Sequence, residues 1–251
     1  MIKQLTIVFL LIFCPVISLS AFEKGLVLYL RFDENDGGIA YDISGNGNDG
    51  NINKAQWVKE GKFDSALMFD GGPESYVRIK NSKSLVPQNQ VTLEAWVYPT
   101  KVAGNNNIIS NTEAAGHNIR FENSKLISYI HVDGAYVTPT GGPNITPEKW
   151  YHTAVAYDGK VSRLYLDGQL IAEAERAGKI TESVQDIFVA SETDANQPNP
   201  TYAFFGIIDE VRIWHVARTN EEILRGMEKP LMVSPRGLMA ICWGDIKGNP
   251  H

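Results

Sequence analysis

The chain has 251 residues, of which 43% are hydrophobic and 21% charged, and its formal net charge is −6 at pH 7. The acidic balance leaves no basic patch that could follow a phosphate backbone, which argues against nucleic acid as a partner. The length and the hydrophobic content allow one large all-β domain.

The N-terminal segment has the features of an export signal. Residues 1–21 carry a positive charge near the start, a short apolar run that ends at Pro15, and small residues before a cleavage point at Ser20 or Ala21. This order predicts a secretory signal peptide. The alternative is a retained membrane anchor, but the run is short for a bilayer. Cleavage would leave Cys242 as the one cysteine, so no disulfide would form within the secreted chain.

After residue 22 the chain contains many short segments rich in β-branched and aromatic residues. Such segments predict strands. Leu26–Phe32 is the first, and two loops rich in Asp, Asn and Gly follow it at residues 33–38 and 42–50, a composition typical of tight turns. The other predicted strands before the last one are Ala66–Asp70, Tyr76–Lys80, Val91–Tyr98, Asn107–Ser110, Asn118–Phe121, Leu126–Val132, Tyr136–Thr138, Trp150–Tyr157, Val161–Leu166, Leu170–Ala174 and Asp186–Ala190.

Local turn and cap motifs mark the ends of several elements. The pairs Asp133-Gly134, Asp158-Gly159 and Asp167-Gly168 each lie between two predicted strands and predict tight hairpins. Residues 191–200 are predicted to form a long polar loop. The run Thr219–Glu222 fits a capping box and predicts the start of a short helix.

The last predicted strand is Gly206–Trp214. Side chains alternate across a strand, so one face would carry Ile207, Asp209, Val211 and Ile213. Three of these four are apolar, so this face is predicted to be buried, and Asp209 would then need a neutralising partner. A bound cation and loop amides are both candidates. Glu210 and Arg212 would lie on the other face, and we expect them to be solvated charges that pair across strands.

Many short strands and one late helix predict an all-β antiparallel β-sandwich with one short C-terminal helix. The predicted organisation is a signal peptide at 1–21, a single domain at 22–228, and a tail or linker at 229–251. This last segment is rich in Gly and Pro from residue 235 onward and is too short to fold alone.

Five stretches of the chain together point to a family. They are Asp42–Gly50, Thr92–Val97, Trp150–Ala154, Tyr165–Gly168 and Gly206–Ile213. Over residues 24–228 their order and spacing resemble the laminin-G-like jelly-roll domain of the concanavalin A-like lectin/glucanase superfamily. The resemblance implies a two-sheet antiparallel jelly-roll β-sandwich, with the first and final strands close to the Asn- and Gly-rich loop. It implies function less strongly, because this fold hosts many roles.

Members of the family often hold a structural calcium ion at the rim of the sheets. The resemblance implies ligands from Asp42, Asn46, Asn48 and Asp209, with Asp33 as a fifth. Calcium takes about six to eight oxygens from carboxylates, amides, carbonyls and water, which suits these residue types. For Asp42, the alternative is an Asx-turn that closes the loop.

Aromatic rings in loops would supply surfaces on which a sugar could stack. The predicted ligand-binding residues are Tyr136, Tyr202 and Trp57. Trp96 and Trp150 lie in strand-like motifs, and we expect them to be packing residues instead. Asparagines in the loops could bind hydroxyl groups, or they could simply reflect loop polarity.

No motif of catalysis is present in the sequence. Glycosidases on this fold use paired carboxylates on one strand, and the nearest match, Glu34-Asn-Asp36, lies in a turn. The histidines do not show the spacing of a zinc site, and there is no Gly-x-Ser-x-Gly elbow. The chain is therefore predicted not to be an enzyme.

Two functions fit these observations. The first is a secreted, non-catalytic module that binds glycans and holds structural calcium. The second is a protein-interaction or adhesion module of a cell-surface or extracellular protein, without a sugar site. A hydrolase with an unusual site is a third, which would need two close carboxylates, with a raised pKa, in a cleft.

Overall fold

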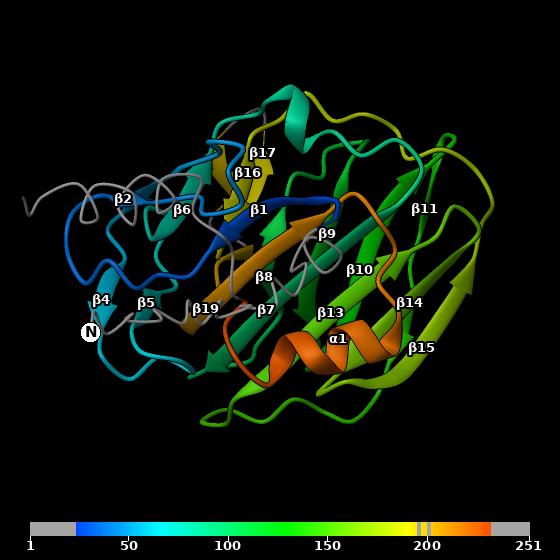
Figure 1. Ribbon diagram of the computed structural model, residues 1–251. Coiled ribbons are helices and arrows are strands. Elements are labelled where there is room, and N and C mark those ends of the chain that lie inside the picture. Colours follow the sequence, from blue (N-terminus) through cyan, green and yellow to red (C-terminus); the bar gives the residue numbers. More distant parts are fainter. Residues whose placement is uncertain (1–23, 195–196, 200–201, 232–251) are drawn as a thin grey trace, which may run out of the picture.

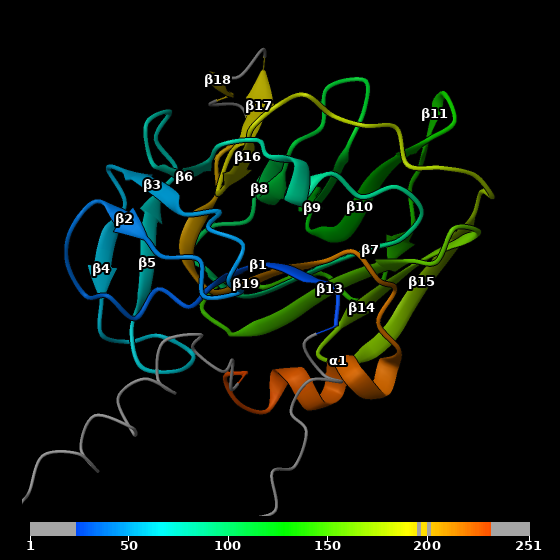
Figure 2. The ribbon, with the colours of Figure 1, turned by 45° about the horizontal axis from the view of Figure 1, so that its top comes forward.

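The computed structural model describes residues 24–194, 197–199 and 202–231. In this part of the chain two antiparallel sheets lie face to face, and helix α1 (Asn220–Met227) lies outside one of them (Figure 1, Figure 2). Sheet A has the order β15-β14-β13-β7-β19-β5-β4, and β1 also pairs with β19. Sheet B has the order β11-β10-β9-β8-β16-β6-β3-β2, with β12 paired to β10. The two-sheet sandwich with one short α-helix confirms the predicted fold class.

The strands are mostly short. Those of sheet A are β1 (Leu26–Leu30), β4 (Gln56–Val58), β5 (Ala66–Asp70), β7 (Val91–Pro99), β13 (Tyr151–Tyr157), β14 (Val161–Leu166), β15 (Gln169–Glu175) and β19 (Phe205–Trp214). Those of sheet B are β2 (Ile39–Ala40), β3 (Gly50–Asn53), β6 (Tyr76–Ile79), β8 (Asn105–Ser110), β9 (His117–Glu122), β10 (Lys125–Val132), β11 (Ala135–Val137), β12 (Thr140–Gly141) and β16 (Ile187–Val189). The remaining elements are β17 (Glu192–Asp194), β18 (Gln197–Asn199) and the 3₁₀ turn η2 (Lys83–Leu85).

The predicted strands agree with the structure to within two residues at each end, and turn chemistry explains why. Asp133 and Asp167 have φ values of 41° and 50°, and the glycines that follow them have φ values of 85° and 73°. Two consecutive left-handed residues form the turn that matches the twist of a hairpin. Asp158 closes the third predicted hairpin, where its backbone N–H donates to Val161 O at 3.2 Å.

The prediction of a long polar loop at residues 191–200 was wrong, because β17 (Glu192–Asp194) pairs with β18 (Gln197–Asn199). Strands β2, β3 and β4 lie in and beside the Asn- and Gly-rich region and were not predicted. Strand β2 pairs with β3 and β4 pairs with β5, and β3 also pairs with the more distant β6. These strands have two to four residues and no repeating apolar pattern, so a local pattern does not report them.

The prediction assumed that the side chains of β19 alternate regularly between its two faces, and the structure interrupts this alternation. The register of β19 with β7 shifts between Asp209 and Arg212, and Glu210 has a φ of 56°. This β-bulge adds one residue, which exchanges the two faces of the strand beyond it. Ile208 before the bulge and Val211 after it therefore both belong to the core between the sheets. The prediction that Asp209 lies on the core-facing row was wrong, because that row assumed unbroken alternation.

The prediction that Glu210 and Arg212 are solvated was also wrong, because both are 1% exposed. Arg212 forms an ion pair with Glu210 on the outer face of sheet A. The hydroxyl of Tyr29 donates to Glu210 Oε2 at 2.6 Å, and Arg212 Nη2 donates to that hydroxyl at 3.3 Å. Burial raises the pKa of Tyr29 well above its usual range, as does the neighbouring Glu210, so the hydroxyl stays protonated.

Glu94 of β7 completes this buried ionic cluster and is fully shielded from solvent. Its carboxylate lies 3.6 Å from His152 Nε2, 3.8 Å from Arg212 Nη1 and 3.6 Å from Arg218 Nη1. Burial alone would raise the pKa of Glu94, but these three neighbours together hold it below its ordinary value. A carboxylate in this position is stable only because cations surround it.

Helix α1 covers the ionic cluster. Arg212 Nη1 donates to Gly226 O at 2.7 Å, and Arg218 Nη2 donates to Glu222 O at 2.6 Å. Gly226 lies in the last turn of α1, where unpaired carbonyls and the helix dipole favour a guanidinium group, whereas Glu222 lies in the first turn. At the other end, the predicted capping box of Thr219 and Glu222 is present in full. After the helix, Leu231 N donates to the Tyr29 hydroxyl at 3.1 Å.

The predicted signal peptide at 1–21 and residues 232–251 of the predicted tail lie outside the described residues. Within the described part, the model contains no helix with both the length and the apolar character that a membrane crossing requires.

Candidate binding site

Tyr136 and Tyr202, both predicted to bind ligand, belong to one cluster on the outer face of sheet B. Arg120 of β9 lies between them in a chain of ring contacts. Its guanidinium carbon is 5.1 Å from the ring centre of Tyr202 and 4.4 Å from that of Tyr129, whose ring in turn contacts Tyr136 at 5.8 Å. We call this surface the Arg120 face. It consists of Arg120, Glu122, Tyr129, His131, Tyr136, Glu192 and Tyr202.

Strand pairing explains how Arg120 and Tyr129 meet. On β9, Ile119 and Phe121 point into the core, so Arg120 points outward between them. On β10, Ile130 likewise points into the core, so Tyr129 and His131 on either side of it point outward. Arg120 is directly opposite Ile127, so Tyr129 is its diagonal neighbour on the same face. Diagonal neighbours across two strands are within reach of long and aromatic side chains.

Two carboxylates hold the guanidinium of Arg120. Its Nε donates to Glu122 Oε2 at 3.1 Å, and its Nη1 lies 3.8 Å from Glu192 Oε1. The hydroxyl of Tyr129 donates to the same Glu122 oxygen at 3.0 Å. Arg120 is 8% exposed, so its position is fixed by packing as well as by charge. Arg120 and its two carboxylate partners thus hold the neighbouring aromatic rings in fixed positions.

The exposed end of the face is Tyr136, which is 36% exposed. Its ring meets His131 edge to face with 4.8 Å between ring centres. Burial raises the pKa of Tyr136, with a further contribution from the charge of Glu192. A half-exposed ring held from one side by other rings can accept a flat apolar surface on its free side.

Glu192 connects the face to the β17–β18 hairpin. Thr112 Oγ1 donates to Glu192 Oε1 at 2.7 Å, and Asn118 Nδ2 donates to that threonine hydroxyl at 3.3 Å. Burial raises the pKa of Glu192 above its ordinary value, although the hydrogen bond from Thr112 and the charge of Arg120 lower it in part. The face therefore offers hydroxyl, amide and carboxylate groups next to the tyrosine rings.

The sequence analysis did not identify Arg120, Tyr129 or Glu192 as site residues. The available signal was the alternation in the two strands, which places polar or aromatic residues opposite the core side. That signal states only that these side chains point outward. The contact between Arg120 and Tyr202, about 80 residues apart in the sequence, depends on the fold.

Trp57, the third residue predicted to bind ligand, has different surroundings. It is in the short edge strand β4 of sheet A and is half-buried against the core. Its Nε1 donates to Gly37 O at 3.0 Å. Trp96 is 5% exposed and meets Phe63 and His152 edge to face, so its predicted packing role is confirmed.

Three of the residues predicted to hold calcium, Asp42, Asn46 and Asn48, lie alongside β1, with Asp42 paired to Leu30 at the end of the strand and the two asparagines at its first residues. The two Asp42 oxygens accept four hydrogen bonds of 2.9 to 3.0 Å from three backbone amides and the Ser44 hydroxyl. The amides of Asn46 and Asn48 donate to the carbonyls of Leu26 and Val27. A carboxylate accepts about four hydrogen bonds, so this arrangement fits the Asx-turn and leaves Asp42 no lone pair for a metal.

The other two, Asp33 and Asp209, lie beyond Leu30, the last residue of β1, which pairs with Val211. Asp209 is fully buried, and its Oδ2 accepts a hydrogen bond from Phe63 N at 3.0 Å. Its Oδ1 is buried and has no hydrogen-bond partner among the described residues. Burial raises the pKa of Asp209 to about 8, and the charges of Glu210 and Asp33 contribute to the increase. A cation bound beside this oxygen would pair with it and would lower the pKa of Asp209.

Asp33 is the more accessible member of this pair. Its Oδ2 lies 2.6 Å from Arg31 Nη2, and its Oδ1 accepts a hydrogen bond from Ser65 N at 3.3 Å. Within the described residues, no group of three or more His, Cys, Asp or Glu side chains is arranged to hold a metal ion. The structure thus divides the predicted calcium ligands into two groups, and calcium binding itself stays a prediction.

Glu34 and Asp36, the nearest match to a catalytic carboxylate pair, lie in the turn where the sequence places them. Glu34 Oε1 accepts a hydrogen bond from Tyr41 N at 2.7 Å, so it stabilises the loop. Asp36 is exposed.

Comparison with solved structures gives binding domains with the same fold. The binding domain of Paraclostridial Mosquitocidal Protein 1 matches with a TM-score of 0.68 at 16% identity, over 82% of this chain and 52% of that one. The botulinum neurotoxin serotype G binding domain matches with a TM-score of 0.63 at 17% identity, over 81% and 50%. Domain 4 of AbnA, a GH43 extracellular arabinanase from Geobacillus stearothermophilus solved with arabinotriose, has a TM-score of 0.56 at 20% identity, over 80% and 97%.

Sequence comparison gives more limited coverage of longer proteins. Mouse (Mus musculus) pappalysin-1 is 32% identical over 107 residues, and human (Homo sapiens) pappalysin-1 is 30% identical over 104 residues. Each match covers 40% of this chain but only 6% of the pappalysin. The family model for the concanavalin A-like lectin/glucanases superfamily, Laminin_G_3, matches residues 70–224. The strand order, the sandwich and this match together show that the chain belongs to the concanavalin A-like lectin/glucanases superfamily.

Proposed function

We propose that the chain is a secreted, non-catalytic module that binds glycans on the Arg120 face. The observation that carries the proposal is that Tyr129 and Tyr202 both contact one buried guanidinium, Arg120, and that Tyr136 in turn contacts Tyr129. Tyrosine rings offer an apolar surface with a polar edge, which suits the mixed faces of a sugar. Secretion rests on the signal peptide predicted at residues 1–21.

The chemistry of the face supports a hydroxyl-bearing ligand over a strongly charged one. Arg120 is already paired with Glu122 and Glu192, so its positive charge is not free for an anionic ligand. The same groups leave oxygen atoms beside the rings that can accept hydrogen bonds from sugar hydroxyls. Among the structural relatives, the AbnA domain was solved with arabinotriose, which supports a glycan as ligand for this fold.

The first test is a glycan array probed with residues 22–251, as wild type and as the variants Tyr136→Ala and Tyr202→Ala. We expect selective binding by the wild type and a loss of about tenfold or more for each variant, because stacking on an aromatic ring contributes roughly 1–2 kcal/mol. Tyr41→Ala is the matched control, since Tyr41 is 55% exposed and lies outside the Arg120 face. Binding that survives in both test variants would contradict the proposal.

The alternative is a protein-interaction or adhesion module without a sugar site. Two structural relatives are the binding domains of a mosquitocidal protein and of a botulinum neurotoxin, which supports this alternative. An array on which the wild type binds nothing would favour it, and a search for protein partners would follow.

A hydrolase is the third possibility, because Glu122 and Glu192 both contact Arg120 and burial raises the pKa of Glu192. Both carboxylates are occupied in holding Arg120, which favours a structural role for them. We therefore expect no turnover of chromogenic aryl glycosides by the wild type. Turnover that disappears in Glu192→Gln would instead assign Glu192 a catalytic role.

We also propose that structural calcium binds at Asp209, with Asp33 as a second carboxylate. The orphaned Oδ1 of Asp209 supports this position, whereas the saturated carboxylate of Asp42 argues against the Asn- and Gly-rich loop. Calcium would supply the positive charge that lets Asp209 ionise inside the protein.

A further inference from the structure

Two histidines, one from each sheet, are neighbours at the end of the sandwich where β19 finishes. His117 is the first residue of β9 in sheet B, and it lies directly opposite Ile130 of β10, which belongs to the core. Residues directly opposite each other in paired strands share a face, so the His117 side chain points between the sheets. His215 follows the last residue of β19 in sheet A, two residues after the core residue Ile213.

The two imidazoles are buried without the partners that a charged ring needs. His117 is fully buried, and neither of its ring nitrogens has a hydrogen-bond partner among the described residues. Nε2 of His215 is also buried, and it has no partner in the same part of the chain. A buried charge is unfavourable unless an opposite charge or hydrogen bonds compensate for it. The folded protein therefore disfavours the protonated form of both rings.

No carboxylate in the described part of the chain compensates for a proton on His117. The segments next to it carry five charged or titratable side chains, namely Lys83, Glu113, His131, Glu182 and Asp186. Three of these are exposed, Asp186 pairs with Arg78, and His131 points to the outer face of sheet B. Among the described groups, only His215 has a charge that acts on the His117 ring. Burial and, to a smaller extent, this charge lower the pKa of His117 to about 4, and burial also lowers the pKa of His215.

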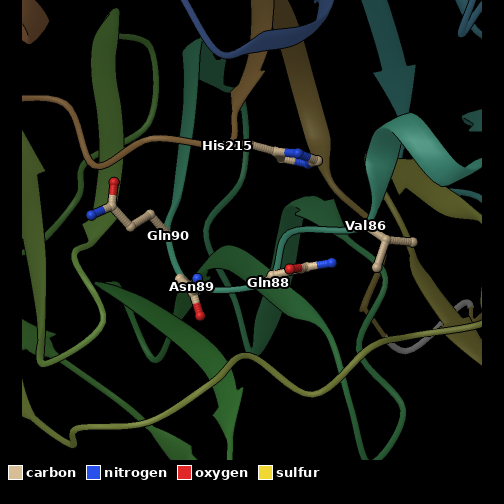
Figure 3. Close-up of a pocket in the computed structure, with 5 residues that line it drawn as sticks. All are labelled: Val86, Gln88, Asn89, Gln90 and His215. Carbon is tan, nitrogen blue, oxygen red and sulfur yellow. The ribbon is translucent and has the colours of Figure 1, made fainter.

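A pocket beside His215 gives a protonated ring a place to go. The pocket has a volume of about 410 Å³ and lies where the segment before β7 approaches the end of β19 (Figure 3). Its other lining residues are uncharged, and they are Val86, Gln88, Asn89 and Gln90. Gln88 and Asn89 are exposed, so the pocket is open to water. An imidazolium that turned from the core toward this pocket would be hydrated and would meet no positive charge in the lining.

We propose that His117 and His215 form an acid-sensitive latch between the two sheets. While both rings are neutral, they pack between the sheets and keep this end of the sandwich closed. Uptake of a proton at either ring opens the end along residues 85–90 and 215–217. Two hydrogen bonds tie these segments down in the closed form, from His215 N to Gly25 O at 2.7 Å and from Ala217 N to Gln90 Oε1 at 3.2 Å. The latch is independent of the function proposed for the Arg120 face.

The test is urea unfolding of residues 22–251 in EDTA at pH 7.5 and at pH 5.0, for the wild type and for His117→Leu. The pKa of His117 falls from an ordinary value of 6.5 to about 4 on folding, so the unfolded chain binds more protons between these values. Stability is therefore lost as the pH falls through this range. We expect the unfolding equilibrium constant of the wild type to rise between the two pH values by roughly 30-fold more than that of His117→Leu. His215→Leu should also reduce the rise, because it removes the second buried ring.

Ile119→Val is the matched control, because Ile119 is the next core-facing residue of β9 and carries no titratable group. It should change stability by the same factor at both pH values. If His117→Leu does not fold, His117→Gln also removes the titrating ring and keeps a polar side chain.

Hydrogen exchange then locates the opening. Between pH 7.5 and pH 5.0 the protection factors of the His215 and Ala217 amides should fall in the wild type and stay constant in the His117 variant, whereas those of β13 should change in neither. A wild-type pH dependence that the His117 variant retains would overturn the proposal. Protection of His215 and Ala217 that does not fall at pH 5.0 would overturn it as well.

Discussion

Replacing Arg212 with methionine is expected to lower the free energy of unfolding by about 3–5 kcal/mol. Arg212 neutralises Glu210, lies 3.8 Å from Glu94 and binds the carbonyl of Gly226 in α1. Without it, Glu210 would lose its buried ion-pair partner and Glu94 would lose one of its cationic neighbours. The measurement is urea unfolding followed by tryptophan fluorescence, since Trp214 is buried beside the cluster.

Two further variants make this test specific. Arg163→Met is the matched control, because Arg163 also pairs with two carboxylates, Asp158 and Glu173, but on the surface of sheet A. We expect it to change the unfolding free energy by less than about 1 kcal/mol. If Arg212→Met is too unstable to purify, Arg212→Lys keeps the charge and should lose less. Equal stability of Arg212→Met and Arg163→Met would refute the role of the cluster.

The second large effect is expected at Asp209. With a pKa raised to about 8 in the folded state, Asp209 binds a proton more tightly than it does in the unfolded chain. The folded state therefore holds more protons between about pH 4 and pH 8, and stability in EDTA should fall as the pH rises through this range. Near neutral pH the ionisable carboxyl would destabilise the fold by on the order of 3 kcal/mol.

The variant Asp209→Asn tests the calcium proposal, because its stability relative to the wild type should differ between EDTA and calcium. In EDTA the variant should be as stable as the wild type or more so near neutral pH, because it removes the buried ionisable group and retains an oxygen for Phe63 N. Added calcium should raise the melting temperature of the wild type and leave that of Asp209→Asn unchanged, since only a ligand bound by the native state stabilises it.

Asp42→Asn distinguishes the two groups of predicted calcium ligands. It should destabilise the protein equally in calcium and in EDTA, because Asp42 binds backbone amides. A calcium-dependent effect at Asp42 with none at Asp209 would refute the proposed position. A wild-type melting curve that calcium does not change would remove the calcium proposal altogether.

The two stability predictions also show where reasoning from the sequence stops. Alternation placed Asp209 on a buried row beside Ile207 and Val211, and it placed Arg212 in solvent. The bulge at Glu210 moved Val211 and Ile213 into phase with Ile208, and α1 covered the other face. Asp209 is buried as expected, but on the face of sheet A that points away from the core between the sheets.

The sequence by itself determined the features that depend on neighbouring residues. Asp-Gly pairs set the hairpins, Thr219 and Glu222 set the start of α1, and the strand residues set most of the strand bounds. Only the tertiary structure decided which distant side chains meet. Tyr202 and Tyr136 belong to one cluster through Arg120 and Tyr129, while Asp42 and Asp209 accept hydrogen bonds from different loops. Strand pairing and one bulge set these positions, and neither leaves a periodic trace in the chain.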